Sequence, residues 1–294
     1  MRRLAILSSV LFLLAGAVSA QAQPAIDGLN EDDIALLNAS GLDADTLHFD
    51  ISLNASVAGD PTLAMGVDLA GSGAVGVDAM GLPLMTMDLE GASSAGELEA
   101  TPAILRLRLV DNILYLLMNE EDGWQVMPLE EGLADAGLPA DTSEIAGAQA
   151  VDVLGWLESL GLDAFSSGAR SEADGMATVL IEVDMSAWLR SPAFSDLMTV
   201  AGDVTQDDSL AAMGPMLGML LQDLLLTIES TVELDGGLMR AMALNLGLAI
   251  DAAALGGGAQ AQTTEVSLTL AFDNMRHDGD VEVSAPEGAA LADA

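Results

Sequence analysis

The strongest constraint on the fold is an alternation of apolar and polar residues in the last third of the chain. Apolar side chains occupy every second position from Val266 to Phe272, and they alternate with the polar residues Glu265, Ser267 and Thr269. A similar period runs through residues 226–234, where threonine and glutamate alternate with leucine, isoleucine and valine. A period of two is typical of antiparallel strands with one buried face. The sequence therefore predicts a sheet that is apolar on one side and polar on the other.

An almost entirely apolar segment, residues 210–226, directly precedes these strands. It predicts a helix that is buried on all sides, with methionines at three-residue spacing. Such a helix either completes a dry core or forms the lid of a cavity, and the sequence leaves both open. The candidate residues that would line a hydrophobic ligand site come from this segment and from the strands after it: Met213, Met216, Leu217, Leu220, Leu221, Leu224, Ile228, Leu268 and Leu270.

The first half of the chain carries the same alternation in short segments separated by turns, which predicts an antiparallel meander. The predicted strands cover residues 47–53, 63–69, 84–89, 105–109, 114–118 and 124–127. Gly71-Ser72-Gly73 predicts a bend or a bulge after the second strand. Helical patterns follow over residues 34–38, 148–160 and 185–200, and Asn30-Glu31-Asp32-Asp33 is expected to cap the first of these helices. A hairpin is expected about Asp174-Gly175. A last strand is expected near residues 281–284.

These patterns predict an α+β fold in which a strongly curved antiparallel sheet, a half-barrel, carries the helices on its concave face. No linker divides the strands from the helices, so one domain is expected. The predicted organisation is a signal peptide over residues 1–20, a linker over 21–28, a single half-barrel domain over 29–285 and a disordered acidic tail over 286–294.

The N-terminus has the three parts of a secretory signal peptide. Arg2 and Arg3 supply the basic region, residues 4–18 are apolar, and Val18-Ser19-Ala20 offers small residues for cleavage. A second cleavage option follows Ala22. Ala17 stands where a lipoprotein signal would need cysteine, so no lipid anchor is expected there. We expect a soluble secreted, periplasmic or extracellular protein.

The composition excludes several classes of partner. The 294 residues carry a formal net charge of -38, and all eight basic residues are arginine. Such a field repels nucleic acid, so no nucleic-acid partner is expected. Hydrophobic residues make up 51% of the chain but aromatic residues only 3%, so the core must be built from aliphatic side chains and methionine. The acidity keeps an apolar protein soluble, and it is also compatible with a saline habitat.

No motif in the sequence supports catalysis or a cofactor. Cysteine is absent, and the two histidines, His48 and His277, cannot form a zinc motif. Residues 71–76 match G-x-G-x-x-G, but a strand rather than a helix is expected to follow, which argues against a dinucleotide site. The acidic clusters at residues 31–33, 120–122 and 203–208 lack calcium-loop spacing. We expect no enzyme, no cofactor and no metal site.

The order of these elements resembles that of the LppX/LprAFG lipoprotein family and, more loosely, the LolA/LolB-like half-barrels. The resemblance rests on a six-strand meander that contains Ile113–Leu117 and Gly123–Val126, on helices inserted in mid-chain, and on an ending at residues 281–286. It covers roughly residues 30–288 and lacks the lipobox cysteine. It implies a half-barrel whose helices close a hydrophobic cavity, and a role in binding or carrying lipids or lipoproteins.

The function that we expect is therefore an exported, non-enzymatic binding protein for a lipid or other hydrophobic ligand. Its partners would be an apolar ligand such as an acyl chain, and transiently a membrane or a lipoprotein. The alternative is a secreted or cell-surface interaction protein whose core is filled by its own side chains. The sequence does not determine the oligomeric state.

The signal peptide gives the first prediction. Mature protein recovered after export by its own signal should begin after Ala20 or Ala22, because small residues precede both positions. N-terminal sequencing or intact-mass measurement checks this. A mature chain that retains residues 1–20 would show instead an uncleaved anchor.

Overall fold

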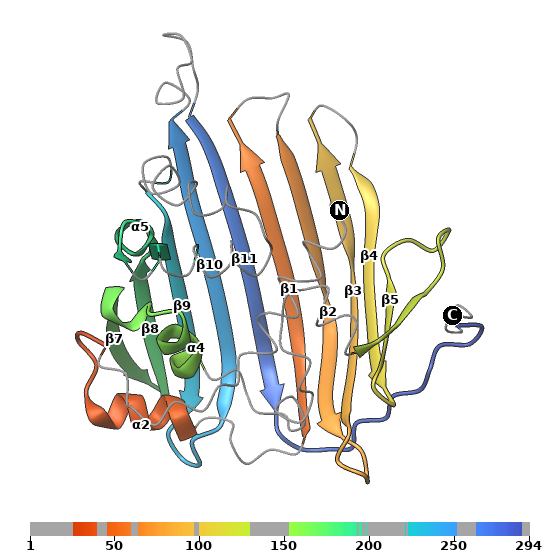
Figure 1. Ribbon diagram of the computed structural model, residues 1–294. Helices are drawn as coiled ribbons and strands as arrows, with labels where there is room; N and C mark the ends of the chain where they lie inside the picture. Colours follow the sequence, from red (N-terminus) through yellow and green to blue (C-terminus); the bar gives the residue numbers. More distant parts are fainter. Residues whose placement is uncertain are drawn as a thin grey trace.

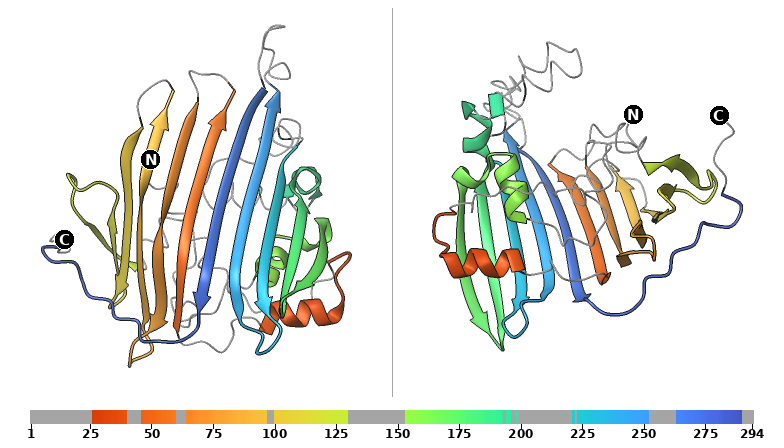
Figure 2. Two further views of the ribbon diagram at one scale, coloured as in Figure 1. Left: turned by 180° about the vertical axis from the view of Figure 1, so that it is seen from behind. Right: turned by 60° about the horizontal axis from the view of Figure 1, so that its bottom comes forward.

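The structure is a computed structural model that describes residues 26–39, 46–59, 64–96, 100–129, 153–192, 194–195, 198, 221, 223–251 and 263–289. These residues form one antiparallel sheet of eleven strands. The strand order is β6-β5-β4-β3-β2-β1-β11-β10-β9-β8-β7, and Figure 1 shows the strands side by side across the whole molecule. Figure 2 shows that they follow one another in a broad arc whose two ends remain apart.

The strands are long for a sheet of this size. Their bounds are β1 Thr46–Ala58, β2 Met65–Val77, β3 Pro83–Ala95, β4 Thr101–Val110, β5 Ile113–Leu117, β6 Gln125–Pro128, β7 Ser166–Ala173, β8 Met176–Asp184, β9 Leu225–Glu233, β10 Met239–Asp251 and β11 Thr263–Arg276. Small residues continue several strands beyond the apolar alternation, which is why the sequence underestimates their length. The meander predicted for residues 47–127 and the hairpin about Asp174-Gly175 are both confirmed.

The helices in the described residues are short and gather at one end of the sheet (Figure 1). They are α2 Glu31–Ala39, α4 Val153–Ser159 and α5 Met185–Leu189, with a single 3₁₀ turn, η2, at Asp163–Phe165. Both α2 and α5 contact β9, and α4 contacts α2. The predicted α+β half-barrel with helices on its concave face is therefore wrong. The described chain is mainly β, because strand pairing accounts for most of it and three short helices cannot cover an eleven-stranded face.

Two further expectations about the elements are wrong. The predicted helix over 210–226 cannot extend to its expected end, because Leu224 has no regular structure and β9 begins at Leu225. Residues 210–220 and 222 lie outside the described residues. The last strand expected near residues 281–284 is not formed, since β11 ends at Arg276 and residues 277–289 contain no strand.

The core is an apolar row that crosses six strands in register. Ile181, Ile228, Leu244, Leu270, Leu53 and Leu69 lie opposite one another from β8 to β2. All except Leu53 are buried, and Leu53 packs against the same cluster. At the helical end the cluster also takes in Leu157 from α4 and Trp188 from α5. Burial of this one face, at about 25 cal/mol per Å² of apolar surface, fixes the register of the sheet.

Glycines in β2 and β3 allow close packing within the sheet. β2 pairs with β1 and β3 without a register shift, so the bulge that was one of the two alternatives predicted at Gly71-Ser72-Gly73 is wrong. At Gly71 an added Cβ would lie 1.8 Å from the carbonyl oxygen of Asp88, and at Gly73 it would meet the Phe49 ring at 2.5 Å. These glycines let the backbone and an aromatic ring approach closely.

Helix α2 is held by its own cap and by one ion pair. The Asn30 side chain accepts hydrogen bonds from the amides of Asp32 and Asp33, and Asp33 Oδ2 accepts one from the Asn30 amide. This reciprocal arrangement is the capping box, and it confirms the cap predicted for this helix. Asp33 Oδ1 also pairs with Arg170 of β7 at 2.8 Å, and only 4% of the Asp33 side chain is exposed. Burial alone would raise the Asp33 pKa, but the hydrogen bond from Arg170 holds it below its usual value.

The residues before α2 cover the outer edge of the sheet at β7. Asp27 forms a parallel bridge with Ser167, and the amide of Gly168 donates to the Asp27 carbonyl at 2.7 Å. Leu29 packs on Gly168, where an added Cβ would lie 2.5 Å from its side chain. Near Ser167 this edge strand is thus paired with the chain itself.

The close approach at Gly71 predicts that Gly71→Ala lowers the free energy of unfolding by about 1–3 kcal/mol, because the strands must move apart. Chemical denaturation measures this. The matched control is Gly247→Ala in β10, where an added Cβ meets nothing within 4 Å and the change should be neutral or stabilising by about 0.5 kcal/mol. Equal effects at the two sites would contradict the packing argument.

The ion pair of Asp33 predicts a pH-dependent contribution to stability. Because the folded-state pKa is lowered, this contribution is present above the unfolded value of about 3.9 and is lost as the pH falls through the folded value. At neutral pH, Asp33→Asn should cost about 1–3 kcal/mol. The difference from wild type should shrink below about pH 4, as followed by denaturation at several pH values. A difference that does not change with pH would exclude the ion pair as its cause.

Candidate functional site

One candidate site is a half-exposed apolar surface beyond the buried row. On the apolar face, two further cross-strand rows lie beyond the buried row, toward the ends of β1 and β10. Both rows consist of apolar residues on four strands, β2, β1, β11 and β10. We call this surface the distal apolar patch; it consists of Ala55, Val57, Met65, Val67, Leu246, Leu248, Val266 and Leu268. Met65 is 56% exposed and the other members are partly buried. The patch therefore continues the core, and its side chains stay partly exposed.

The predicted ligand-lining residues divide between core and patch. Ile228 is fully buried and Leu270 is 5% exposed, so both belong to the filled core. Leu268 lies in the distal apolar patch and is half-buried. The structure therefore brings one predicted residue of the sheet, Leu268, to a surface that a ligand can reach. Met213, Met216, Leu217 and Leu220 lie outside the described residues.

Leu221 and Leu224 are anchored rather than free. Ser186 of α5 accepts a hydrogen bond from the Leu224 amide at 2.9 Å, and its hydroxyl lies 3.1 Å from the Leu221 carbonyl oxygen. Both leucines are half-buried against the core cluster. This segment, predicted as the end of a lid helix, is fixed to the body of the protein where the structure describes it.

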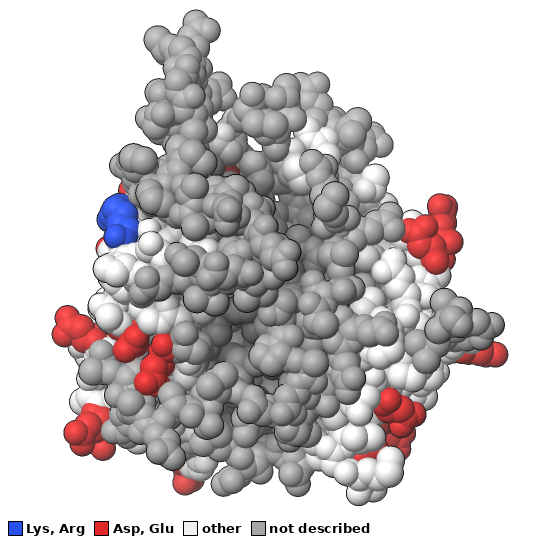
Figure 3. Space-filling model, in the orientation of Figure 1, with Lys and Arg blue, Asp and Glu red and all other residues white. Residues whose placement is uncertain are grey.

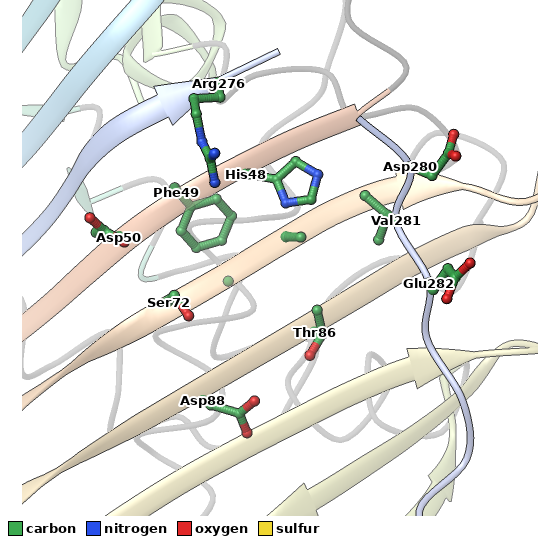
Figure 4. Close-up of a pocket in the computed structure, with 12 residues that line it drawn as sticks. His48, Phe49, Asp50, Ser72, Thr86, Asp88, Arg276, Asp280, Val281 and Glu282 are labelled. Carbon is green, nitrogen blue, oxygen red and sulfur yellow. The ribbon is translucent and has the colours of Figure 1, made fainter. Parts of the chain in front are cut away.

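A second candidate site lies on the polar face, and no pattern in the sequence predicted it. It is a cavity of about 310 Å³ between the sheet and the chain after β11. Figure 4 shows Asp280, Val281 and Glu282 passing over the ends of β1, β2 and β3. The lining residues are His48, Phe49, Asp50, Ser72, Gly73, Ala74, Thr86, Asp88, Arg276, Asp280, Val281 and Glu282.

A β-bulge aims Arg276 at this cavity. His48 pairs with Arg276 but Asp50 pairs with Asp273, so β11 has one extra residue between these two pairs. Asn274 takes up the extra residue with a left-handed φ of 51°. Without it, strict alternation from Asp273 would turn Arg276 to the apolar face, because a shift of one residue reverses every side chain. The same Asn274 donates a hydrogen bond to Asp50 at 2.7 Å.

Two arginines pair with carboxylates on the polar face of β3 and β4. Arg108 makes two hydrogen bonds with the carboxylate of Asp88 and lies 6.0 Å from the Trp124 ring. Arg106 pairs with Glu90 at 2.8 Å, and this hydrogen bond raises the Arg106 pKa above its usual value. These pairs neutralise Asp88 and hold one wall of the cavity.

The other residues considered from the sequence have structural positions. Residues 71–76, which match G-x-G-x-x-G, lie inside β2. His277 lies 2.8 Å from the Met239 carbonyl oxygen through Nε2, and its buried Nδ1 has no hydrogen-bond partner among the described residues. His48 is half-exposed and lines the polar cavity. Within the described ranges, no group of three metal-ligating side chains comes together.

Figure 3 shows one face of the molecule with its described charged residues in colour. In that view the described aspartates and glutamates occupy the rim of the molecule. Where the structure describes the chain, no helix is long and apolar enough to cross a membrane. These carboxylates are thus placed where water can solvate them.

Comparison with known proteins finds a likeness in structure but none in sequence. No protein-family model and no curated protein matches the sequence. Among solved structures, the chain is similar to a DUF1329 family protein from Desulfovibrio piger. The two are 7% identical, the match covers 82% of this chain and 88% of that chain, and the TM-score is 0.23. The large antiparallel sheet that the LppX/LprAFG resemblance implied is confirmed, while membership of that family stays a prediction.

Proposed function

We propose that the protein is a non-enzymatic binding protein for a hydrophobic ligand, such as a lipid or an acyl chain, and that the ligand covers the distal apolar patch. The observation that carries this proposal is the half-exposed continuation of the core across β2, β1, β11 and β10. Covering it removes apolar surface from water, which contributes about 25 cal/mol per Å² before the costs of association.

The shape of the patch favours a small linear ligand over a protein partner. Four strands at a spacing of about 4.8 Å give a strip about 14 Å across, which suits an extended apolar chain laid over the strands. A stable protein interface uses about 20–30 residues on each side, and the patch has far fewer. A flexible side chain such as Met65 at its edge adapts to ligands of different shape.

The alternative, an interaction protein with a self-filled core, is supported by the complete burial of Ile228 and the near-complete burial of Leu270. On that alternative the middle of the sheet is filled and the distal apolar patch has no ligand. The two functions differ in one measurable property, which is whether the purified protein binds an apolar probe on this patch.

The test is binding of a fluorescent fatty acid to wild type, Leu268→Gln and Ser267→Gln. Leu268 lies in the patch, whereas Ser267 is exposed on the opposite face of the same strand and hydrogen-bonds Ser56. We expect Leu268→Gln to weaken binding at least about tenfold, since a buried amide without a partner costs about 1–3 kcal/mol. Ser267→Gln should bind like wild type.

Two outcomes would contradict the proposal. Wild type that binds no fatty acid would favour the interaction protein with a self-filled core. Equal binding by wild type and Leu268→Gln would show that the fatty acid occupies another surface. Circular dichroism and the thermal midpoint of each variant confirm that the comparison is between folded proteins.

A further inference from the structure

We propose that the polar cavity between β1–β3 and residues 280–282 binds a small zwitterion, of the class of a free α-amino acid. The carboxylate of the ligand would pair with Arg276, and its ammonium group with Asp50. This site is separate from the proposed hydrophobic site, since the two occupy opposite faces of the sheet. The proposal does not depend on the hydrophobic ligand.

The first observation is that opposite charges line this cavity without pairing with each other. Arg276 makes no ion pair with any residue that the structure describes, whereas Arg106, Arg108, Arg170 and Arg240 all pair with carboxylates. In a chain with a net charge of -38, an arginine beside Asp50 that leaves this carboxylate unpaired is unusual. Both charged groups are therefore available to a third molecule.

The second observation is that the backbone holds the two charges at a spacing that suits a zwitterion. Arg276 lies opposite His48 across the β1–β11 pair, and Asp50 is two residues further along β1. Diagonal neighbours of this kind have α-carbons about 7–8 Å apart, which leaves room between the side chains for a small molecule. The bulge at Asn274 positions both charged groups. It directs Arg276 to the polar face, and the Asn274 side chain donates a hydrogen bond to Asp50.

The third observation is that the floor of the cavity is low and polar. On this face of β2 the side chain of Ala74, opposite His48, is small, while the hydroxyls of Ser72 and Thr86 can each donate and accept a hydrogen bond. The volume of about 310 Å³ lies at the lower end of the range for small-molecule sites. Figure 4 shows these groups on neighbouring strands under the chain that carries Val281.

The balance of charge argues against a purely anionic or a purely cationic ligand. Asp88 is neutralised by Arg108, and Figure 4 shows the carboxylates of Asp280 and Glu282 directed away from Arg276. An anion at Arg276 would lie beside Asp50 and be repelled, and a cation at Asp50 would lie beside Arg276. A molecule that carries both charges at short separation satisfies both groups.

The experiment is calorimetric titration of the full chain with three probes of similar size. Serine carries both charges, serinamide carries only the positive charge and glycerate only the negative charge. Glycine and leucine, titrated as further amino acids, cover smaller and larger side chains. We expect saturable binding of at least one of the three amino acids serine, glycine and leucine. If serine binds, serinamide and glycerate should each bind at least tenfold more weakly than serine.

The variants Arg276→Gln and Asp50→Asn should each weaken amino-acid binding at least tenfold. Their side chains are exposed, so the fold should survive, as thermal midpoints will show. The matched controls are Arg190→Gln and Asp174→Asn, which make the same changes at exposed positions away from the cavity. Leu268→Gln should leave amino-acid binding unchanged, because it alters the other face.

Three results would overturn the proposal. No heat of binding with any of the amino acids would show that the cavity does not take this class of ligand. Binding of serinamide or glycerate as strong as that of serine would show that only one charge is recognised. Binding that persists in both Arg276→Gln and Asp50→Asn would place the amino acid elsewhere on the protein.

Discussion

The pairing of β1 with β11 is the interaction on which the rest of the structure depends. It joins two meanders, β1–β6 and β7–β11, which would otherwise be separate sheets. Residues more than two hundred positions apart, such as Leu53 and Leu270, meet there in register. Because the apolar row of both meanders becomes continuous only through this pair, burial on each side reinforces the register on the other. The bulge that sets the polar cavity lies in the same pair of strands.

Local patterns predicted the parts of this fold that are governed by local interactions. The alternation over residues 266–272 and the positive-φ turn at Asp174-Gly175 depend only on neighbours in sequence, and the cap at Asn30 depends on residues within one helical turn. The sheet as a whole could not be predicted in this way, since Gly71 and Gly91 resemble turn residues although they are internal to strands. Their role depends on carbonyl groups of a neighbouring strand, Asp88 and Asp68.

In the candidate sites too, local patterns predict some features, whereas other features depend on the folded sheet. Leu268 could be identified from its place in the alternating apolar pattern, but its exposure depends on how far the core extends toward the end of β11. Arg276 could not be identified at all, because regular alternation places it on the apolar face. One extra residue in β11 reverses that assignment, and the positive φ at Asn274 is its only local sign. Asparagine tolerates this conformation better than most residues, so an Asn at the end of a predicted strand is a weak indication of a bulge.

The bridge between Asp27 and Ser167 has a consequence for how the protein behaves in concentrated solution. An exposed edge strand is a template on which strands of other molecules can add, and long sheets made of aliphatic residues are prone to this association. The segment that begins at Ile26 takes up hydrogen-bonding positions of β7 and places Leu29 over Gly168. At the other edge, β6 is only four residues long and ends in Pro128, which has no amide proton to offer. An apolar sheet with both ends blunted in this way can remain a separate molecule where a bare-edged sheet would polymerise.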